Sequence, residues 1–175
     1  SLINLDLIIK ADPPINLTVS NYFTEDTLDS ILKIQYWISK IQSEKIKNIF
    51  SVALLTILEK MSTHRKDGNG VKKKKYINQN FTVAKIKELL FDQLKLFIHD
   101  IENNILKIKP VIKYQSSFDP YCLDKKADIV ITSPPYANCF DYSKVYLVEL
   151  WFGGFFKSTD DQKYFRQSSI TSHVH

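Results

Sequence analysis

The feature that most constrains the fold is a short, mostly apolar run that leads directly into a double proline. Residues 127–131 (Ala-Asp-Ile-Val-Ile) follow two lysines, and Ser133, Pro134, Pro135 and Tyr136 come shortly after them. Such a run, bounded by charged residues and prolines, is typical of a buried strand in an α/β sheet. The prolines lack an N–H group and restrict φ, so they end the strand. We therefore expect an α/β fold whose ligand site lies beyond the carboxyl end of this strand.

The predicted turn presents two hydrogen-bond acceptors beside an aromatic ring. The Ser133 hydroxyl and the Pro134 carbonyl can both accept hydrogen bonds from one amino group. The ring of Tyr136 offers a flat surface on which a nucleobase can stack, an interaction of about 1–3 kcal/mol. The turn thus suits a planar heterocycle that carries an exocyclic amino group.

The stretch from Ile131 to Asn138 resembles the (Asp/Asn/Ser)-Pro-Pro-(Tyr/Phe) motif of S-adenosylmethionine-dependent DNA amino-methyltransferases. Asp141-Tyr142, Tyr146 and Glu149-Leu150-Trp151 extend the resemblance into the helix that follows the motif. It implies methylation of the exocyclic amino group of cytosine or adenine in DNA, within restriction-modification. Serine at the first motif position is more frequent in the cytosine-modifying members, and adenine stays open.

The resemblance also implies roles for single residues. It places Ser133, Pro134, Pro135 and Tyr136 in the catalytic site, and Asn138 and Tyr142 in the substrate pocket. Asp119 is a candidate on the cofactor side, although an Asp-Pro turn explains it equally. S-adenosylmethionine is the expected cofactor, DNA the expected partner, and a companion restriction endonuclease a further one.

The resemblance leaves one motif unmatched. These methyltransferases hold the methyl donor with a Phe-x-Gly-x-Gly loop after the first strand, and none of the four glycines of this chain is so placed. We therefore expect a fragment of a longer methyltransferase that is inactive alone. Two alternatives remain: a non-catalytic nucleic-acid-binding or assembly module, and an amino-methyltransferase that acts on RNA or protein.

Three helices are expected before the motif, and they divide the chain. Apolar residues recur at helical spacing after Thr24, from Ile46 to Met61, and from Thr82 to about Asn104. We expect a truncated lead-in or linker over 1–23, a helical region over 24–109 and a partial methyltransferase α/β region over 110–175. The last region begins with a second strand at 111–116. It includes an aromatic-rich stretch at 142–156, in which we expect a helix that ends at Gly153-Gly154. The fold class is therefore α/β, part of a Rossmann-like sheet with a large helical insertion.

A basic stretch, residues 62–76, separates the second and third helices and lacks apolar periodicity, which predicts a loop. It is either an arm that contacts nucleic-acid phosphates or a solvated turn. The net charge of +5 at pH 7 does not decide between the two. Its six candidate phosphate contacts are Arg65, Lys66, Lys72, Lys73, Lys74 and Lys75.

The cysteines and the hydropathy indicate whether to expect a metal site, a membrane span or a signal peptide. Cys122 and Cys139 are too few and too far apart for a metal cluster, so no metal is expected. Two thiols fit a reducing compartment. No apolar run reaches the length of a membrane span, and no signal peptide pattern opens the chain, so we expect a cytoplasmic protein.

Overall fold

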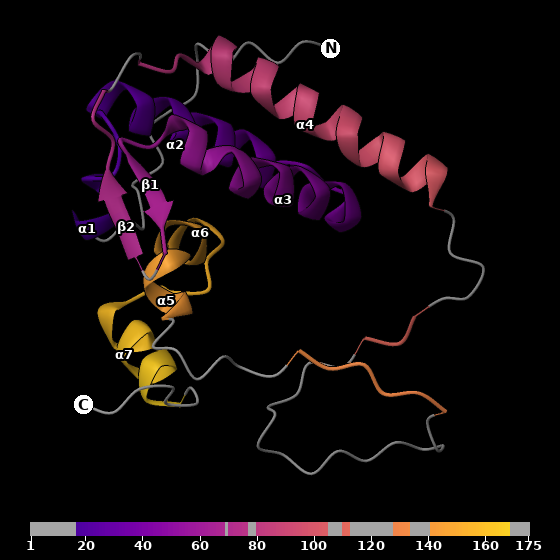
Figure 1. Cartoon of the computed structure of the whole chain (residues 1–175). Helices are drawn as coiled ribbons and strands as arrows, with labels where there is room; N and C mark the ends of the chain where they lie inside the picture. The colour runs from indigo at the N-terminus through magenta and orange to yellow at the C-terminus, as the bar shows by residue number, and fades with distance from the viewer. Residues whose placement is uncertain are drawn as a thin grey trace.

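The structure, a computed structural model, describes residues 17–68, 70–76, 80–104, 110–112, 128–133 and 141–168. Within these ranges the chain is mixed α/β, mostly helical, with one two-stranded antiparallel sheet (Figure 1). The elements are α1 (Leu17–Ser20), α2 (Glu25–Ser39), α3 (Glu44–Met61), β1 (His64–Asp67), β2 (Gly70–Lys73), α4 (Val83–Asn103), α5 (Tyr142–Val145), α6 (Leu147–Phe152) and α7 (Thr159–Ser168). The mixed α/β class is confirmed at this coarse level.

Helices α2, α3 and α4 are the three helices expected from apolar spacing, and each packs against the other two. Side-chain caps begin two of them: Ser43 accepts a hydrogen bond from the Ile46 N–H, and Thr82 accepts one from the Lys85 N–H. Their inward faces meet in a continuous core that also takes in α1 and α6. Its fully buried large side chains are Val19, Ile31, Ile34, Ile57, Leu58, Ile86 and Leu90.

The apolar stripes of α3 and α4 are longer than the faces that they bury. On α4, Ile86, Leu90 and Leu94 are buried, whereas Ile98 and Ile101 are exposed. The reason is length, because α4 has 21 residues and α2 has 15, and α4 extends past its neighbours in Figure 1. The sequence pattern therefore predicted the helix correctly and overestimated its packed part.

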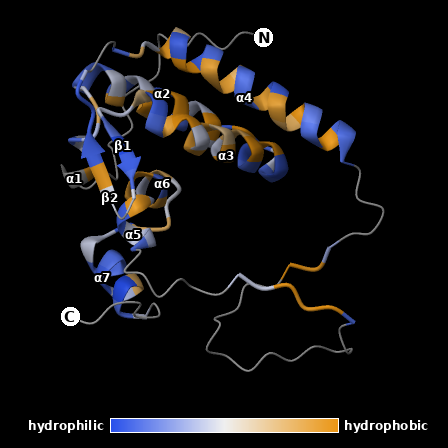
Figure 2. Ribbon diagram, in the orientation of Figure 1, coloured by the Kyte–Doolittle hydropathy of each residue, from blue (hydrophilic) through white to orange (hydrophobic). Residues whose placement is uncertain are grey.

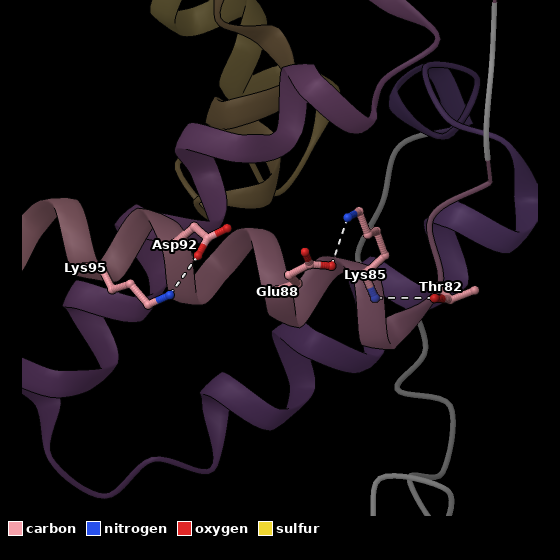
Figure 3. A network of polar contacts seen from close by, with 5 residues as sticks. All are labelled: Thr82, Lys85, Glu88, Asp92 and Lys95. Atoms are coloured by element: carbon pink, nitrogen blue, oxygen red, sulfur yellow. Dashed lines mark hydrogen bonds and ion pairs between the residues drawn. The ribbon is translucent and has the colours of Figure 1, made fainter.

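The polar face of α4 carries ion pairs one turn apart (Figure 3). Lys85 pairs with Glu88 at 2.8 Å, and Lys95 pairs with Asp92 at 3.0 Å. All four side chains are exposed, so each pair contributes only a few tenths of a kcal/mol. This face is solvated.

The segment 17–23, which falls within the expected lead-in at 1–23, contributes two side chains to the core. Val19 and Phe23 are buried, and the Phe23 ring packs edge-on against Phe152 with centroids 5.6 Å apart. The Tyr22 carbonyl accepts the Thr63 N–H at 2.7 Å, which ties this segment to the start of the basic stretch 62–76 that follows α3. The segment therefore helps to bring α6 against the helices.

The prediction of a loop over 62–76 is wrong for most of that stretch. Strands β1 and β2 form an antiparallel hairpin in which Arg65 faces Lys72 and Asp67 faces Gly70. Gly68, with φ +53°, supplies the left-handed conformation that the turn needs. The sequence pattern did not predict the hairpin, because its strands are polar and show no apolar alternation. Its stability comes from backbone pairing and from contacts to α3 and α5.

The prediction of a buried strand at 127–131 is also wrong for the residues that the structure describes. Residues 128–133 belong to no strand, and Ile129, Val130 and Ile131 are 78%, 78% and 93% exposed. Figure 2 shows their apolar colour on a segment apart from the helices. Residues 111 and 112, from the second expected strand, are likewise exposed and unpaired with any strand. A strand forms only where a neighbouring strand takes its hydrogen bonds, and the described residues place none beside them.

The aromatic helix expected between Tyr142 and Gly153 is present in two short pieces. The chain bends at Tyr146, with φ −102° and ψ 22°, between α5 and α6. Gly153 and Gly154 end α6 as predicted; a Cβ at Gly153 would lie 2.8 Å from the Glu149 carbonyl oxygen, and Gly154 has φ +73°. Helix α7 follows and contacts α5.

Candidate functional site

The tertiary structure brings the basic hairpin beside the helices that follow the double proline. Strand β2 contacts α5, and Lys66 of β1 forms an ion pair with Glu149 of α6. The Lys66 ammonium also lies 4.2 Å from the ring centroid of Tyr146, a cation–π geometry. Residues about 80 positions apart in the sequence thus share one surface.

The residues predicted for the double-proline turn are only partly described. Ser133 is exposed and lies in no regular element. Pro134, Pro135, Tyr136, Asn138 and Asp119 lie outside the described residues. Tyr142 is the first residue of α5 and is about half exposed. Their assignment to one pocket therefore stays a prediction.

The six basic candidates of the hairpin fall into two groups. Arg65, Lys72, Lys73 and Lys75 are exposed, and Lys72 forms an ion pair with Asp67 across the hairpin. Lys66 and Lys74 are half-buried.

Lys66 and Lys74 already have partners within the protein. Lys66 has Glu149 and the Tyr146 ring as partners, and Lys74 donates to the Glu59 carbonyl at 2.8 Å. Burial lowers the pKa of Lys74, and the Glu59 charge opposes this effect. These two lysines hold the hairpin in place, whereas the four exposed residues face solvent.

Burial and the positive charges of the hairpin affect the pKa of His64, the first residue of β1. Burial lowers the pKa of His64, and the positive charges of Lys73 and Lys74 lower it further. Its ring packs edge-on against Tyr22 at 4.6 Å, and its Nδ1 lies 2.8 Å from the Thr63 hydroxyl. We assign His64 a structural role at the base of the hairpin.

Asp141 fixes the start of α5. Its carboxylate accepts hydrogen bonds from the Ser143 and Lys144 N–H groups at 3.0 and 3.3 Å and from the Ser143 hydroxyl. Arg166 of α7 reaches the same carboxylate at 3.3 Å. Burial acts to raise the pKa of Asp141. The Ser143 hydrogen bond and the nearby positive charges outweigh burial and hold that pKa below its usual value.

Sequence reasoning assigned no role to Asp141, Tyr146 or Glu149, although all three stood in the segment that resembled methyltransferases. Glu149 is mostly buried, and its Oε2 has no hydrogen-bond partner among the described residues. Tyr142, Tyr146 and Glu149 recur at i, i+4 and i+7, a spacing that predicts one helix face. The spacing could have shown that these residues share a face. Only the structure shows that Lys66 contacts Tyr146 and Glu149 on it.

No glycine of the described residues occupies the position expected for a loop that holds a nucleotide-like methyl donor. Gly68 and Gly70 lie in and beside the hairpin turn, and Gly153 and Gly154 follow the end of α6. None joins the end of a strand to the start of a helix, where a glycine loop can cradle such a ligand.

The described part of the chain contains no group of three acidic, histidine or cysteine side chains that could hold a metal ion. Its helices include none that is both long and apolar enough to cross a membrane.

Comparison with known proteins identifies relatives by sequence. The chain is 30% identical, over 75% of its length, to Type II methyltransferase M.BsoBI of Geobacillus stearothermophilus, of which it covers 32%. It is 31% identical, over 67% of its length, to Type II methyltransferase M.AvaI from Nostoc sp. and from Anabaena variabilis, covering 29% of each.

No protein-family model matches the chain, and no solved structure matches it. The chain spans about a third of the length of the curated relatives, and the resemblance to DNA methyltransferases is confirmed at the level of these relatives. By sequence, the chain is therefore similar to Type II methyltransferases over about a third of their length.

Proposed function

We propose that the protein methylates the exocyclic amino group of a base in DNA, as part of a restriction-modification system. The observation that carries this proposal is the sequence relationship to proteins named Type II methyltransferases. The Ser-Pro-Pro-Tyr motif supports the amino group as the target, and its serine favours cytosine over adenine. A companion restriction endonuclease is the partner that such a system would supply.

The chemistry required of this chain is to hold and activate the target amino nitrogen. Its lone pair is delocalised into the base ring, so the nitrogen is a poor nucleophile. Acceptors placed out of the base plane favour a tetrahedral nitrogen and make the lone pair available. In the proposal, the Ser133 hydroxyl and the Pro134 carbonyl are these acceptors, Tyr136 stacks on the base, and Asn138 and Tyr142 line the pocket.

The exposed cations of the hairpin are the proposed contacts to the DNA backbone. Arg65, Lys72, Lys73 and Lys75 face solvent, while Lys66 and Lys74 hold the hairpin against the rest of the molecule. We therefore narrow the phosphate-contacting set to the first four residues. Each phosphate contact releases counterions and adds about 0.9 to the salt slope of duplex binding.

S-adenosylmethionine is the proposed methyl donor, and we place its site in a part of the protein beyond the described residues. No described glycine suits a donor loop, and the relatives are about three times as long as the matched region. The division at residues 23 and 109 and a Rossmann-like sheet that includes 110–175 are parts of the same proposal.

Calorimetric titration of S-adenosylmethionine into this chain tests the placement of the donor site. No binding is the expected result, and one-to-one binding would mean that the donor site is complete here.

Methyl transfer to DNA, assayed in a form of the protein that binds the donor, tests the activity. Ser133→Ala and Tyr136→Ala should lower the rate at least tenfold, with DNA binding mostly kept. Tyr136→Phe keeps the stacking ring and should retain most of the rate. Unchanged rates in the alanine variants would contradict the assigned roles.

The phosphate contacts are tested by the salt dependence of DNA binding. Replacing Lys73 and Lys75 with alanine should lower the slope of log K against log salt by about 1.8 if each lysine contacts one phosphate. Lys95→Ala on α4, an exposed lysine outside the hairpin, is the matched control and should leave the slope unchanged. An unchanged slope in the hairpin variant would return the hairpin to a purely structural role.

A non-catalytic nucleic-acid-binding or assembly module is the second candidate function, favoured by the lack of a donor loop among the described residues. DNA binding without methyl transfer, in a form that binds the donor, would select it. An enzyme that acts on RNA or on protein would instead transfer methyl groups to those substrates and leave DNA unmodified.

A further inference from the structure

The two strands of the hairpin present one face to the body of the protein and the other to solvent. Side chains alternate along a strand, and residues directly opposite each other share a face. Lys66 and its opposite residue Val71 are half-buried, and the Lys66 ammonium contacts Glu149 of α6. Arg65 and its opposite residue Lys72 are exposed. The face that carries Arg65 and Lys72 is therefore the outward face of the hairpin.

Asp67 belongs to this outward face and lies next to the hairpin turn. It follows Arg65 by two residues on β1 and lies opposite Gly70 on β2. Its side chain is 35% exposed and forms an ion pair with Lys72. A Cβ added at Gly68 or at Gly70 would meet no atom within 4 Å, so the space beside these glycines is open. A glycine in a strand often marks a place where a ligand approaches the backbone closely.

Asp67 is also the only carboxylate in the basic stretch 62–76. The hydrogen bond from Lys72, with the charges of Lys72 and Arg65, holds the pKa of Asp67 below its usual value. The carboxylate is therefore ionised at neutral pH and can only accept hydrogen bonds. A DNA phosphate has no donor to offer it and repels it. The donors that DNA exposes in the major groove are the exocyclic amino groups of cytosine and adenine.

The form of the hairpin suits the same groove. The major groove of B-form DNA admits a two-stranded β-ribbon, whereas the minor groove is about half as wide. A ribbon that lies in the major groove directs the side chains of one face at the base edges. For this hairpin that face is the outward one, because the other face contacts the body of the protein.

We propose that the outward face of the hairpin enters the major groove and that Asp67 recognises a paired base there, by accepting a hydrogen bond from the exocyclic amino group of cytosine or adenine. Asp67 is then a specificity-determining residue, and the exposed cations around it contact the phosphates. The recognised base is distinct from the target base proposed for Ser133–Tyr136. The inference rests on the proposed DNA-binding function and goes beyond it, because phosphate contacts carry no sequence information.

The test selects the sequences that this chain binds from a library of random duplexes and sequences the bound fraction. The wild type should prefer cytosine or adenine at one position about 5- to 150-fold, and the identity of the enriched base distinguishes the two sources of the amino group. Asp67→Ala should lose that preference and keep any others. Its affinity for unrelated duplexes should not fall, since a negative charge is removed. Asp67→Asn should prefer adenine, because an asparagine amide pairs with both N6 and N7 of that base.

Asp92→Ala on α4 is the matched control, because Asp92 is an exposed carboxylate that also pairs with a lysine, Lys95. It should leave the base preference unchanged. Circular dichroism and the urea midpoint check that each variant folds.

Two results would overturn the base contact and show that Asp67 only holds Lys72 in place. One is an unchanged base preference in Asp67→Ala, and the other is an affinity that falls equally for every sequence. A wild type that binds all duplexes alike would also overturn it, while the proposed phosphate contacts stand. If the wild type binds no duplex, DNA binding by this chain and the base contact fail together.

Discussion

Helix α3 and the segment 128–133 are both strongly apolar, but only α3 is buried. Ile57 is 0% exposed in the core, whereas Ile131 is 93% exposed. A helix satisfies its own backbone hydrogen bonds, so its apolar face needs only another face to pack on. A strand needs a neighbour for its hydrogen bonds as well as a cover for its side chains. The comparison teaches that apolar content predicts burial only where the backbone can also be satisfied.

The sharpest form of this comparison is a pair of isoleucine truncations. Ile57→Ala should lower the free energy of unfolding by about 2–5 kcal/mol, because it leaves a cavity in the core. Ile131→Ala should change it by less than about 0.5 kcal/mol, since the side chain is exposed. Urea unfolding followed by circular dichroism measures both. A large effect of Ile131→Ala in this chain would show that the segment is packed, and would break the comparison.

The second prediction concerns the ion pair between Lys66 of β1 and Glu149 of α6, the helix that follows the segment 128–133 along the chain. Glu149→Gln should destabilise by about 1–2 kcal/mol, because it removes the charged partner of the half-buried Lys66. Combined with Lys66→Met, the two losses should be less than additive in a double-mutant cycle of unfolding free energies.

The exposed pair Lys95–Asp92 serves as the control for this cycle, and its coupling should be close to zero. Additive losses at Lys66 and Glu149 would mean that α6 is held to the hairpin by other contacts.

A third prediction tests whether the hairpin unfolds together with the helical core. Gly68→Ala should cost about 1 kcal/mol, because Gly68 has φ +53° and a Cβ is disfavoured there. Gly70→Ala is the matched control: a Cβ at Gly70 meets no atom within 4 Å, and its φ is not in the left-handed region. Thermal unfolding at fixed pH compares the two. Equal midpoints would indicate that the hairpin unfolds separately from the core.

The smallest expected effect is electrostatic and lies at Asp141. Its folded-state pKa is lowered, so its charge stabilises the fold above the unfolded value of 3.8 and this contribution is lost as pH falls through the folded pKa. Asp141→Asn keeps a capping side chain and removes the charge. The variant should be less stable by about 0.5–1 kcal/mol at pH 7, and the difference should vanish in acid below the folded pKa.

Asp92→Asn on α4, an exposed carboxylate, is the control substitution and should cost little stability at pH 7. A difference between wild type and Asp141→Asn that persists in strong acid would mean that Asp141 acts through its shape and not through its charge.

The three long helices could be predicted because their spacing and caps are local. Thr24 and Thr82 precede α2 and α4 in the structure, and the two glycines follow the end of α6, as their places in the sequence predicted. The hairpin could not be predicted, since its polar strands carry no alternation and depend on contacts from distant segments. The described part of the segment 127–131 was misjudged because a strand's partners lie elsewhere in a sequence.

The candidate site divides in the same way. The sequence by itself determined which residue types could serve a base-modifying enzyme: the Ser-Pro-Pro-Tyr turn, the cations of the hairpin and the aromatic residues after the turn. Only the tertiary structure decided that Lys66 pairs with Glu149, so that the hairpin lies beside Tyr142 and Tyr146. The physical reason is range, because caps and helical spacing act within a few residues, whereas ion pairs, stacking and sheet pairing join residues that are far apart along the chain.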